Sequence, residues 1–291
     1  MKGMRPSWTA VFIMMKIDLH IHSTASDGTE TPRDIVRQCA AKGIDMCAVT
    51  DHDNVDAQKD AADESTRLGM RYVTGVEISA QYTGELHILG YGMDLADRAF
   101  REFMEELRTF RVERTLEFVR RLGEHGIDIA LEDVKRWANG NTLGRPHVAL
   151  ALVEKGYADT YRDAFDTYLN EGGLCYVNRR RLMPREAIDL IRSAGGIPVL
   201  AHPGLITTDD LPRLVRSLVD LGLEGIEAHY PLHTDEQLAS YLALAGQLGL
   251  IVTCGSDYHG ASRENALGCE TRTSKLLETS VERLAALCAA G

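Results

Sequence analysis

Short apolar segments alternate with amphipathic segments along most of this 291-residue chain, and this alternation restricts the fold more than any other feature. The apolar segments have the length of buried strands, and the amphipathic ones repeat apolar residues at helical spacing. Residues 32–43 are typical, because Pro32 suits a first helical turn and Gly43 a helix end. The alternation predicts a parallel α/β architecture with helices connecting the strands. The predicted strands are 15–21, 45–50, 70–76, 86–91, 197–201, 225–228 and 251–256, and the predicted helices among them are 32–43, 57–69, 184–193, 211–221 and 235–248.

The pattern changes in the middle of the chain, where no predicted strand interrupts the helical segments. A long charged helix is expected over 97–124, followed by shorter helices over 131–138, 146–155 and 160–170. The strands on either side suggest a closed barrel, whose site lies at the carboxyl ends of the strands. We therefore expect an N-terminal extension at 1–14, a barrel domain made of 15–98 and 182–291, and a helical insertion at 99–181 that caps the substrate.

Charge and cysteine usage narrow the expected partners and compartment. The chain has 43 acidic and 32 basic residues, a formal net charge of −11. Long nucleic acids and anionic membranes are bound through basic surfaces, so we expect neither as a partner. A small anionic substrate held by a few arginines or metal ions is compatible with this charge. No apolar run is long enough for a transmembrane helix. None of the six cysteines forms a C-x-x-C pair, and we expect reduced thiols in a cytoplasmic protein.

Histidines and carboxylates follow most of the predicted strands. His20 and His22 lie two residues apart on one strand, so both imidazoles share a face and can reach one ion. Glu77 and Asp257 follow apolar runs, and a buried carboxylate without a partner costs several kcal/mol. A cation removes that cost, and mixed imidazole and carboxylate ligands suit Mn, Zn or Fe. The sequence therefore predicts a polynuclear metal site. The remaining candidates at the strand ends are Asp27, His52, His87, His202 and His259.

These motifs resemble those of the polymerase and histidinol phosphatase (PHP) family. The resemblance rests on Asp18-x-His20-x-His22, Thr50-Asp51-His52-Asp53, Gly75-Val76-Glu77, His87, His202-Pro203 and Asp257-x-His259. It implies a distorted seven-stranded barrel, similar to that of the wider amidohydrolase group, and three divalent metal ions. By this resemblance the first ion takes His20, His22, Glu77 and Asp257, the second takes Glu77, His87 and His202, and the third takes Asp27, His52 and His259. Manganese suits the oxygen ligands, with zinc or iron as alternatives.

The insertion resembles that of a PHP branch of small phosphoesterases, on the basis of the segment Gly144-Arg145-Pro146-His147. Those enzymes act on nucleotides, including 3′,5′-nucleoside bisphosphates, and on short 5′-phosphorylated oligonucleotides. We expect a phosphomonoesterase that removes the 3′-phosphate of such a bisphosphate, giving AMP from the adenosine compound, by attack of a metal-bound hydroxide. An exonuclease on short oligonucleotides, a histidinol-phosphate phosphatase, an amide-hydrolysing barrel and a non-catalytic metal-binding module stay open.

The candidate substrate-binding residues lie in the insertion. Arg145 and His147 stand at the start of a predicted helix, whose free N–H groups favour an anion. Arg179 follows a strand-like segment and matches an arginine of the family, and a guanidinium binds phosphate through two parallel donors. We expect these three residues to hold a substrate phosphate. His229 follows a predicted strand and is either a catalytic acid for the leaving oxygen or a hydrogen-bonded loop residue.

Overall fold

Most of the strands are buried segments, as β1 illustrates: all five of its residues are buried, including the polar Asp18 and His20. The computed structural model describes residues 16–82, 84–138, 143–178, 182–262, 265–269 and 275–288. Its eight strands form two sheets, with the orders β1-β2-β3 and β4-β5-β6-β7-β8. The strands are β1 (Ile17–Ile21), β2 (Met46–Val49), β3 (Arg71–Tyr72), β4 (Gly75–Tyr82), β5 (Gly84–Tyr91), β6 (Ile197–Leu200), β7 (Gly225–His229) and β8 (Ile251–Cys254).

The arrangement differs from the expected parallel, closed barrel of seven strands in two ways. First, β5 is antiparallel to both β4 and β6. The reason is the link between β4 and β5, which is far too short for the crossover that parallel neighbours need. Second, the predicted strand 70–76 was wrong, because it spans the end of β3 and the start of β4. At Gly75 the chain passes against Thr50, where a Cβ atom would lie 2.6 Å from the Thr50 methyl carbon.

The two sheets meet at the ends of their strands. A parallel bridge joins His52 to Glu77, beyond the end of β2, and another joins Ile21 to Tyr258, beyond the end of β8. The Asp257 N–H donates to the His20 carbonyl at 2.8 Å. Segments that carry the predicted metal ligands are thereby brought side by side, although the described strands do not form one closed sheet.

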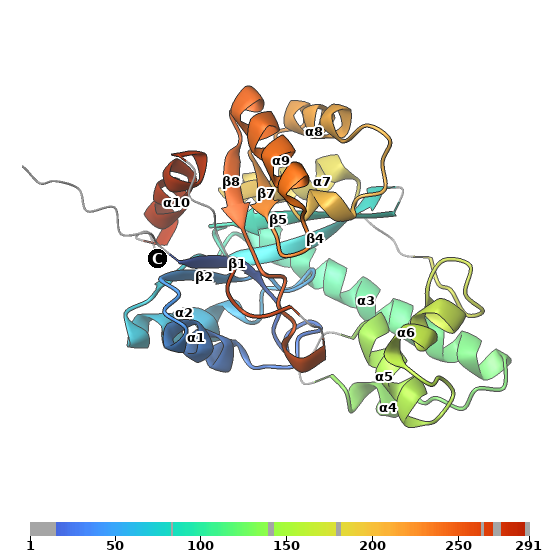
Figure 1. Ribbon diagram of the computed structural model, residues 1–291. Helices are drawn as coiled ribbons and strands as arrows, with labels where there is room; N and C mark the ends of the chain where they lie inside the picture. Colours follow the sequence, from blue (N-terminus) through green and yellow to red (C-terminus); the bar gives the residue numbers. More distant parts are fainter. Residues whose placement is uncertain are drawn as a thin grey trace, which may run out of the picture.

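Capping residues mark the helix boundaries. Thr31 and Asp97 accept hydrogen bonds from the first turns of α1 and α3, and Gly69 and Gly249 end α2 and α9 in the left-handed conformation. In Figure 1, α1 and α2 pack beside β1 and β2, and α7, α8 and α9 lie around the second sheet. The sequence did not predict α10. The helices are α1 (Pro32–Ala41), α2 (Gln58–Leu68), α3 (Arg98–Glu124), α4 (Leu131–Lys135), α5 (Arg145–Glu154), α6 (Tyr161–Ala164), α7 (Pro184–Ser193), α8 (Leu211–Asp220), α9 (Asp235–Leu248) and α10 (Lys275–Cys288).

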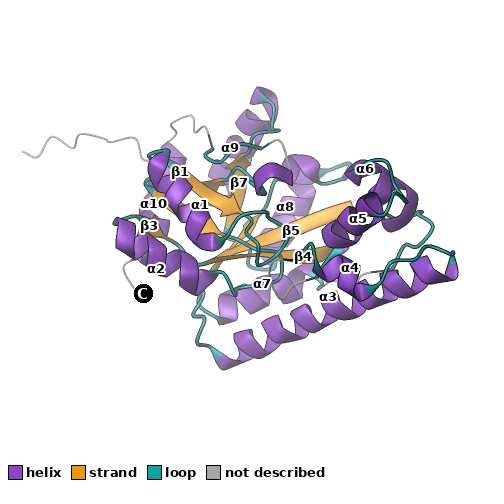
Figure 2. Cartoon of the chain, turned by 90° about the horizontal axis from the view of Figure 1, so that it is seen from below, coloured by secondary structure: helices purple, strands orange, loops and turns teal. Residues whose placement is uncertain are grey.

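The helical segment between β5 and β6 has an apolar cluster of its own. Phe118 and Leu122 of α3 pack there with Val134, Val148 and Leu152. Figure 2 shows α3 running along one side of the molecule, with α4, α5 and α6 gathered near its far end. The expected helix at 160–170 is α6 followed by a π-helical turn, Phe165–Leu169. None of the described helices has both the length and the apolar character needed to cross a bilayer. The expected extension at 1–14 lies outside the described residues.

Candidate metal centre

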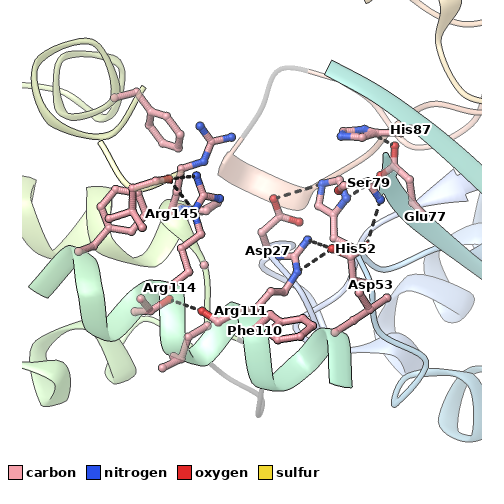
Figure 3. Close-up of a pocket in the computed structure, with 18 of the residues that line it drawn as sticks. Asp27, His52, Asp53, Glu77, Ser79, His87, Phe110, Arg111, Arg114 and Arg145 are labelled. Atoms are coloured by element: carbon pink, nitrogen blue, oxygen red, sulfur yellow. Dashed lines mark hydrogen bonds and ion pairs between the residues drawn. The ribbon is translucent and has the colours of Figure 1, made fainter. Parts of the chain in front are cut away.

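All nine candidate metal ligands lie close together where the two sheets meet. Strands β1, β4 and β5 carry His20, Glu77 and His87, and the loops after β2, β6 and β8 carry His52, His202 and Asp257. Figure 3 shows Asp27, His52, Glu77 and His87 at one end of a pocket. The other members are His22 and His259. These side chains are buried or nearly so, and the two sheets hold them in place.

Glu77 is the centre of the cluster. Its Oε1 lies 2.7 Å from His87 Nδ1 and 3.1 Å from His202 Nε2. Its Oε2 lies 3.3 Å from His20 Nε2 and 3.0 Å from His52 Nδ1. The two oxygens of Glu77 thus face different sets of imidazoles.

Asp27 and Asp257 supply the other carboxylates of the cluster. Asp27 Oδ1 lies 3.4 Å from His259 Nε2, and its Oδ2 lies 3.9 Å from His52 Nε2. Asp257 Oδ1 lies 3.2 Å from His22 Nε2. The residues can be grouped so that one ligand atom from each falls within 4.8 Å of the others: His22, Asp27, His52 and His259; His20, His22 and Glu77; His52, Glu77 and His87.

The chemistry of this cluster fits divalent cations. His22 Nδ1, His52 Nδ1 and Glu77 Oε2 are buried and have no hydrogen-bond partner among the described residues. His20 Nε2 and His22 Nε2 face each other at 3.1 Å. Leaving buried polar atoms unsatisfied is costly. A cation between these atoms would remove that cost, and imidazole with carboxylate is a donor set that Mn, Zn and Fe accept.

Electrostatics keep the carboxylates of the cluster ionised. Burial would raise the pKa of Glu77, but the imidazoles of His87 and His52 outweigh it and hold that pKa well below its usual value. Burial would likewise raise the pKa of Asp27, but the imidazoles around it, led by His259 and His52, outweigh burial and hold that pKa well below its usual value. For His52 itself, burial dominates and lowers the pKa to about 4. Charged carboxylates and a neutral imidazole are the forms that bind metal.

Several residues that support the cluster were not predicted from the sequence. Glu227 on β7 is fully buried, and its carboxylate accepts hydrogen bonds from His20 Nδ1 at 3.1 Å and from the His202 backbone N–H at 2.8 Å. The Tyr230 hydroxyl donates to Asp257 at 3.0 Å. The available signal was a glutamate inside an apolar strand, where a buried carboxylate needs a partner.

Asp51 also supports the cluster. Its carboxylate accepts hydrogen bonds from the Ser23 backbone N–H at 2.8 Å and from the Ser26 hydroxyl at 2.5 Å. These bonds hold the turn that carries Asp27. In the sequence analysis, Asp51 was one residue of the motif Thr50-Asp51-His52-Asp53, and no separate role was predicted for it.

A cavity of about 420 Å³ extends from the cluster to the helical insertion. Arg111, Arg114 and Arg145 line it on the insertion side. Figure 3 shows Arg114 and Arg145 across the pocket from the candidate ligands, with Arg111 between them. The Arg145 guanidinium lies over the Phe165 ring at 5.4 Å, and Arg114 donates to the Val177 carbonyl at 2.9 Å. The pocket thus has three arginines, together with Glu113 and Glu117, at one wall and the candidate metal ligands at the other.

His147 and His229 do not line the pocket. His147 is buried and does not line the pocket, since its Nδ1 turns back to accept the Gly144 N–H at 3.1 Å. Burial lowers the pKa of His147. His229 ends β7, is 3% exposed and is also absent from the pocket wall. Arg179 falls outside the described residues.

Comparisons with known proteins agree with this geometry. The family model of the PHP domain matches residues 18–173. The chain is 32% identical to the 3′,5′-nucleoside bisphosphate phosphatase of Chromobacterium violaceum, over 84% of this chain and 88% of that protein. It is 34% identical to the phosphoribosyl 1,2-cyclic phosphate 1,2-diphosphodiesterase of Eggerthella lenta, over 84% and 94%. It is 36% identical to the 5′-3′ exoribonuclease Rnm of Salmonella typhimurium, over 83% and 84%.

A solved structure extends the likeness to the whole fold. The structure of an amidohydrolase from Chromobacterium violaceum with bound sulfate superposes with a TM-score of 0.84 at 30% identity, covering 94% of this chain and 96% of that one. The family match covers more than half of the chain, and the relatives cover most of it. This chain belongs to the PHP domain family.

Proposed function

We propose that this protein is a metal-dependent phosphoesterase that removes the 3′-phosphate from 3′,5′-nucleoside bisphosphates. The observation that carries the proposal is a single pocket with a cluster of imidazoles and carboxylates at one wall and arginines at the other. A substrate with two phosphates matches both walls. The cavity volume of about 420 Å³ is of the size that holds one small molecule.

The two walls have different tasks in this proposal. Divalent ions bound by the cluster would supply Lewis acidity and an activated water. Arg145 and Arg114 would hold the phosphate that does not react, because a guanidinium binds phosphate oxygens through paired donors. Holding that phosphate orients the other one at the cluster, which lowers the entropic cost of reaction. Arg179 is kept as a further candidate for the same phosphate.

We also propose three divalent ions, with manganese first and zinc or iron as alternatives. By the family resemblance, the first would take His20, His22, Glu77 and Asp257, the second Glu77, His87 and His202, and the third Asp27, His52 and His259. Support comes from Glu77, whose oxygens face both of the first two groups. The third group is supported by His52, whose Nε2 lies 3.9 Å from Asp27 Oδ2 while its Nδ1 faces Glu77.

The partner and compartment follow from charge and thiol chemistry. A net charge of −11 supports a small nucleotide over a long nucleic acid or a membrane. All six cysteines are free thiols, which supports the cytoplasm as the compartment.

A second candidate is a 5′-3′ exonuclease that trims short 5′-phosphorylated oligonucleotides. It is favoured by the likeness to a protein named as an exoribonuclease, at 36% identity over 83% of this chain. The same arginines would then hold the terminal 5′-phosphate. The cluster would face the first phosphodiester bond.

The proposal is tested by measuring the phosphate that the manganese-loaded protein releases from its substrate. Adenosine 3′,5′-bisphosphate is expected to give AMP and phosphate, whereas shortening of a labelled 5′-phosphorylated oligonucleotide without bisphosphate turnover would favour the exonuclease. His20→Ala and Asp257→Ala should abolish release while the fold is retained, because both lie in the cluster. His125→Ala, an exposed histidine at the end of α3, is the matched control and should keep full activity. Both functions would be rejected if the bisphosphate released no phosphate and the oligonucleotide was not shortened.

A further inference from the structure

We infer that Arg111 binds the phosphoryl group at the metal centre and is held ready for it by Asp53. This role rests on the proposed function, and it gives Arg111 a task distinct from that of Arg114 and Arg145. Arg111 comes from α3 of the insertion, whereas Asp53 directly follows the candidate ligand His52. One ion pair therefore joins the insertion to the metal centre.

The geometry of Asp53 fixes the guanidinium. Asp53 is 3% exposed and has a left-handed backbone conformation with φ of 47°, which is uncommon for a residue other than glycine. Its Oδ1 accepts the Ser79 N–H at 3.0 Å. Its Oδ2 accepts both Arg111 Nε at 2.9 Å and Arg111 Nη2 at 2.8 Å. Such a backbone persists when surrounding contacts determine it, and these contacts also set the direction of the arginine.

Arg111 keeps donors that this pair does not use. A guanidinium has five N–H donors, and the bonds to Asp53 use one on Nε and one on Nη2. The side chain lines the pocket and is 15% exposed there. The Nη1 end of the guanidinium lies beside Gly144, which also lines the pocket. The unused donors are thus placed in the cavity near the cluster.

The chemistry explains why a pre-positioned arginine is useful at this point. Hydrolysis of a phosphate ester spreads negative charge over the non-bridging oxygens of the reacting phosphoryl group. Donors that are already oriented stabilise this charge without reorganisation. The Asp53 carboxylate supplies that orientation, and it also limits the net positive charge that is buried when the pocket is empty of substrate.

Binding of inorganic phosphate tests the inference without turnover. Calorimetric titration of the manganese-loaded protein with phosphate should show at least about tenfold weaker binding for Arg111→Ala, with Arg111→Lys intermediate, because lysine keeps the charge and loses the fork. Asp53→Asn should weaken phosphate binding less than Arg111→Ala, because the guanidinium stays but loses its charged anchor. Arg108→Ala is the matched control on the same helix, with an exposed partner, Glu105, and should bind phosphate as the unmodified protein does.

Activity and metal content complete the test. With bisphosphate substrate, Arg111→Ala should lower kcat/KM by about 100-fold, the size expected for a lost charge-stabilising donor, while the bound manganese is unchanged. Added guanidinium ion should restore part of the activity of Arg111→Ala. Unchanged phosphate binding in a folded, metal-loaded Arg111→Ala would overturn the inference, as would loss of bound metal in both Arg111→Ala and Arg111→Lys. If phosphate binding depends on Arg111 but no bisphosphate is hydrolysed, the proposed function fails and this inference stands.

Discussion

At the residue scale, Glu227 decides which nitrogen of His20 faces the cluster. The His20 Nδ1–H donates to the Glu227 carboxylate, so the lone pair of a neutral imidazole lies on Nε2. That Nε2 lies 3.3 Å from Glu77 and 3.6 Å from Asp257. Gly255 gives space for this arrangement, because a Cβ atom there would lie 2.4 Å from Glu227 Oε1. Carboxylates that orient a ligand histidine commonly strengthen metal binding.

Glu227→Gln is expected to weaken manganese binding by about 10- to 100-fold, because the neutral amide orients His20 less strongly and lowers its basicity. Titration calorimetry of the metal-free protein measures this directly. Glu224→Gln is the matched control, since Glu224 precedes the same strand and pairs with Arg283 at the surface. Equal manganese affinity of Glu227→Gln and the unmodified protein would show that Glu227 does not support the cluster.

Most of the candidate ligands could be predicted because they follow or end an apolar run, where a buried imidazole or carboxylate requires a partner. Asp27 lies in a polar turn and His87 in the first half of its strand, and the resemblance to the family completed the set. Glu227 has the same signal but lies inside its strand, and the sequence does not say which neighbouring residue it meets. One partner of Glu227 is His20, 207 residues away, and it is brought near by the packing of β7 against β8 and of β8 against β1. For His147 the prediction was made but did not hold. Its place at a helix start suggested that it binds a substrate phosphate, whereas its ring accepts the Gly144 N–H and so caps that helix.

At the element scale, helix α3 serves two apolar cores. Its first half places Phe100 and Met104 against the core around the second sheet, and its second half places Phe118 and Leu122 in the core of the insertion. The two halves are joined by the segment that carries Arg111. The position of this one helix therefore sets how Arg111 and Arg114 face the cluster.

Leu122→Ala should destabilise the insertion by about 2–5 kcal/mol, because Leu122 is fully buried and the deleted atoms leave a cavity. Denaturant unfolding followed by circular dichroism gives this value. Leu116→Ala on the same helix is the control, since Leu116 is 44% exposed and its loss should change the stability little. Manganese content should be unchanged in both variants, because the cluster belongs to the sheets. Equal stability of the two variants would contradict a separate core in the insertion.

Helices were more predictable than strand directions for a local reason. Pro184 marks the start of α7. Thr234 marks the start of α9 and Gly249 its end, so each boundary is set by a residue at or next to it. The antiparallel β5 depends on the short link after β4, which carries none of the Asn-Gly or Asp-Gly signals of a tight hairpin. The alternation of strands and helices on both sides then favoured a parallel interpretation.

At the scale of the whole molecule, the buried apolar residues form clusters that do not depend on the metal centre. The described residues contain three such clusters: one shared by the two sheets, one in the insertion, and one between α1, α2 and the first sheet. The candidate ligands add little apolar contact to them. The fold is therefore expected to form without metal, and bound metal is expected to add stability by mass action.

Removal of metal by a chelator should lower the Tm while leaving a cooperative transition and an unchanged far-ultraviolet circular dichroism spectrum. Metal at 100 times its Kd stabilises the folded state by about 2.7 kcal/mol. For a chain of this size that corresponds to a decrease of roughly 5–10 °C on chelation. Titration of manganese into the stripped protein should restore the original Tm, and magnesium, which keeps its own water ligands, should restore less. In the His20→Ala variant the Tm should respond weakly to the chelator and to added manganese, because one of the candidate ligands is missing. A Tm that is the same with and without the chelator in the unmodified protein, together with no bound manganese, would show that the buried imidazoles and carboxylates are held by hydrogen bonds alone.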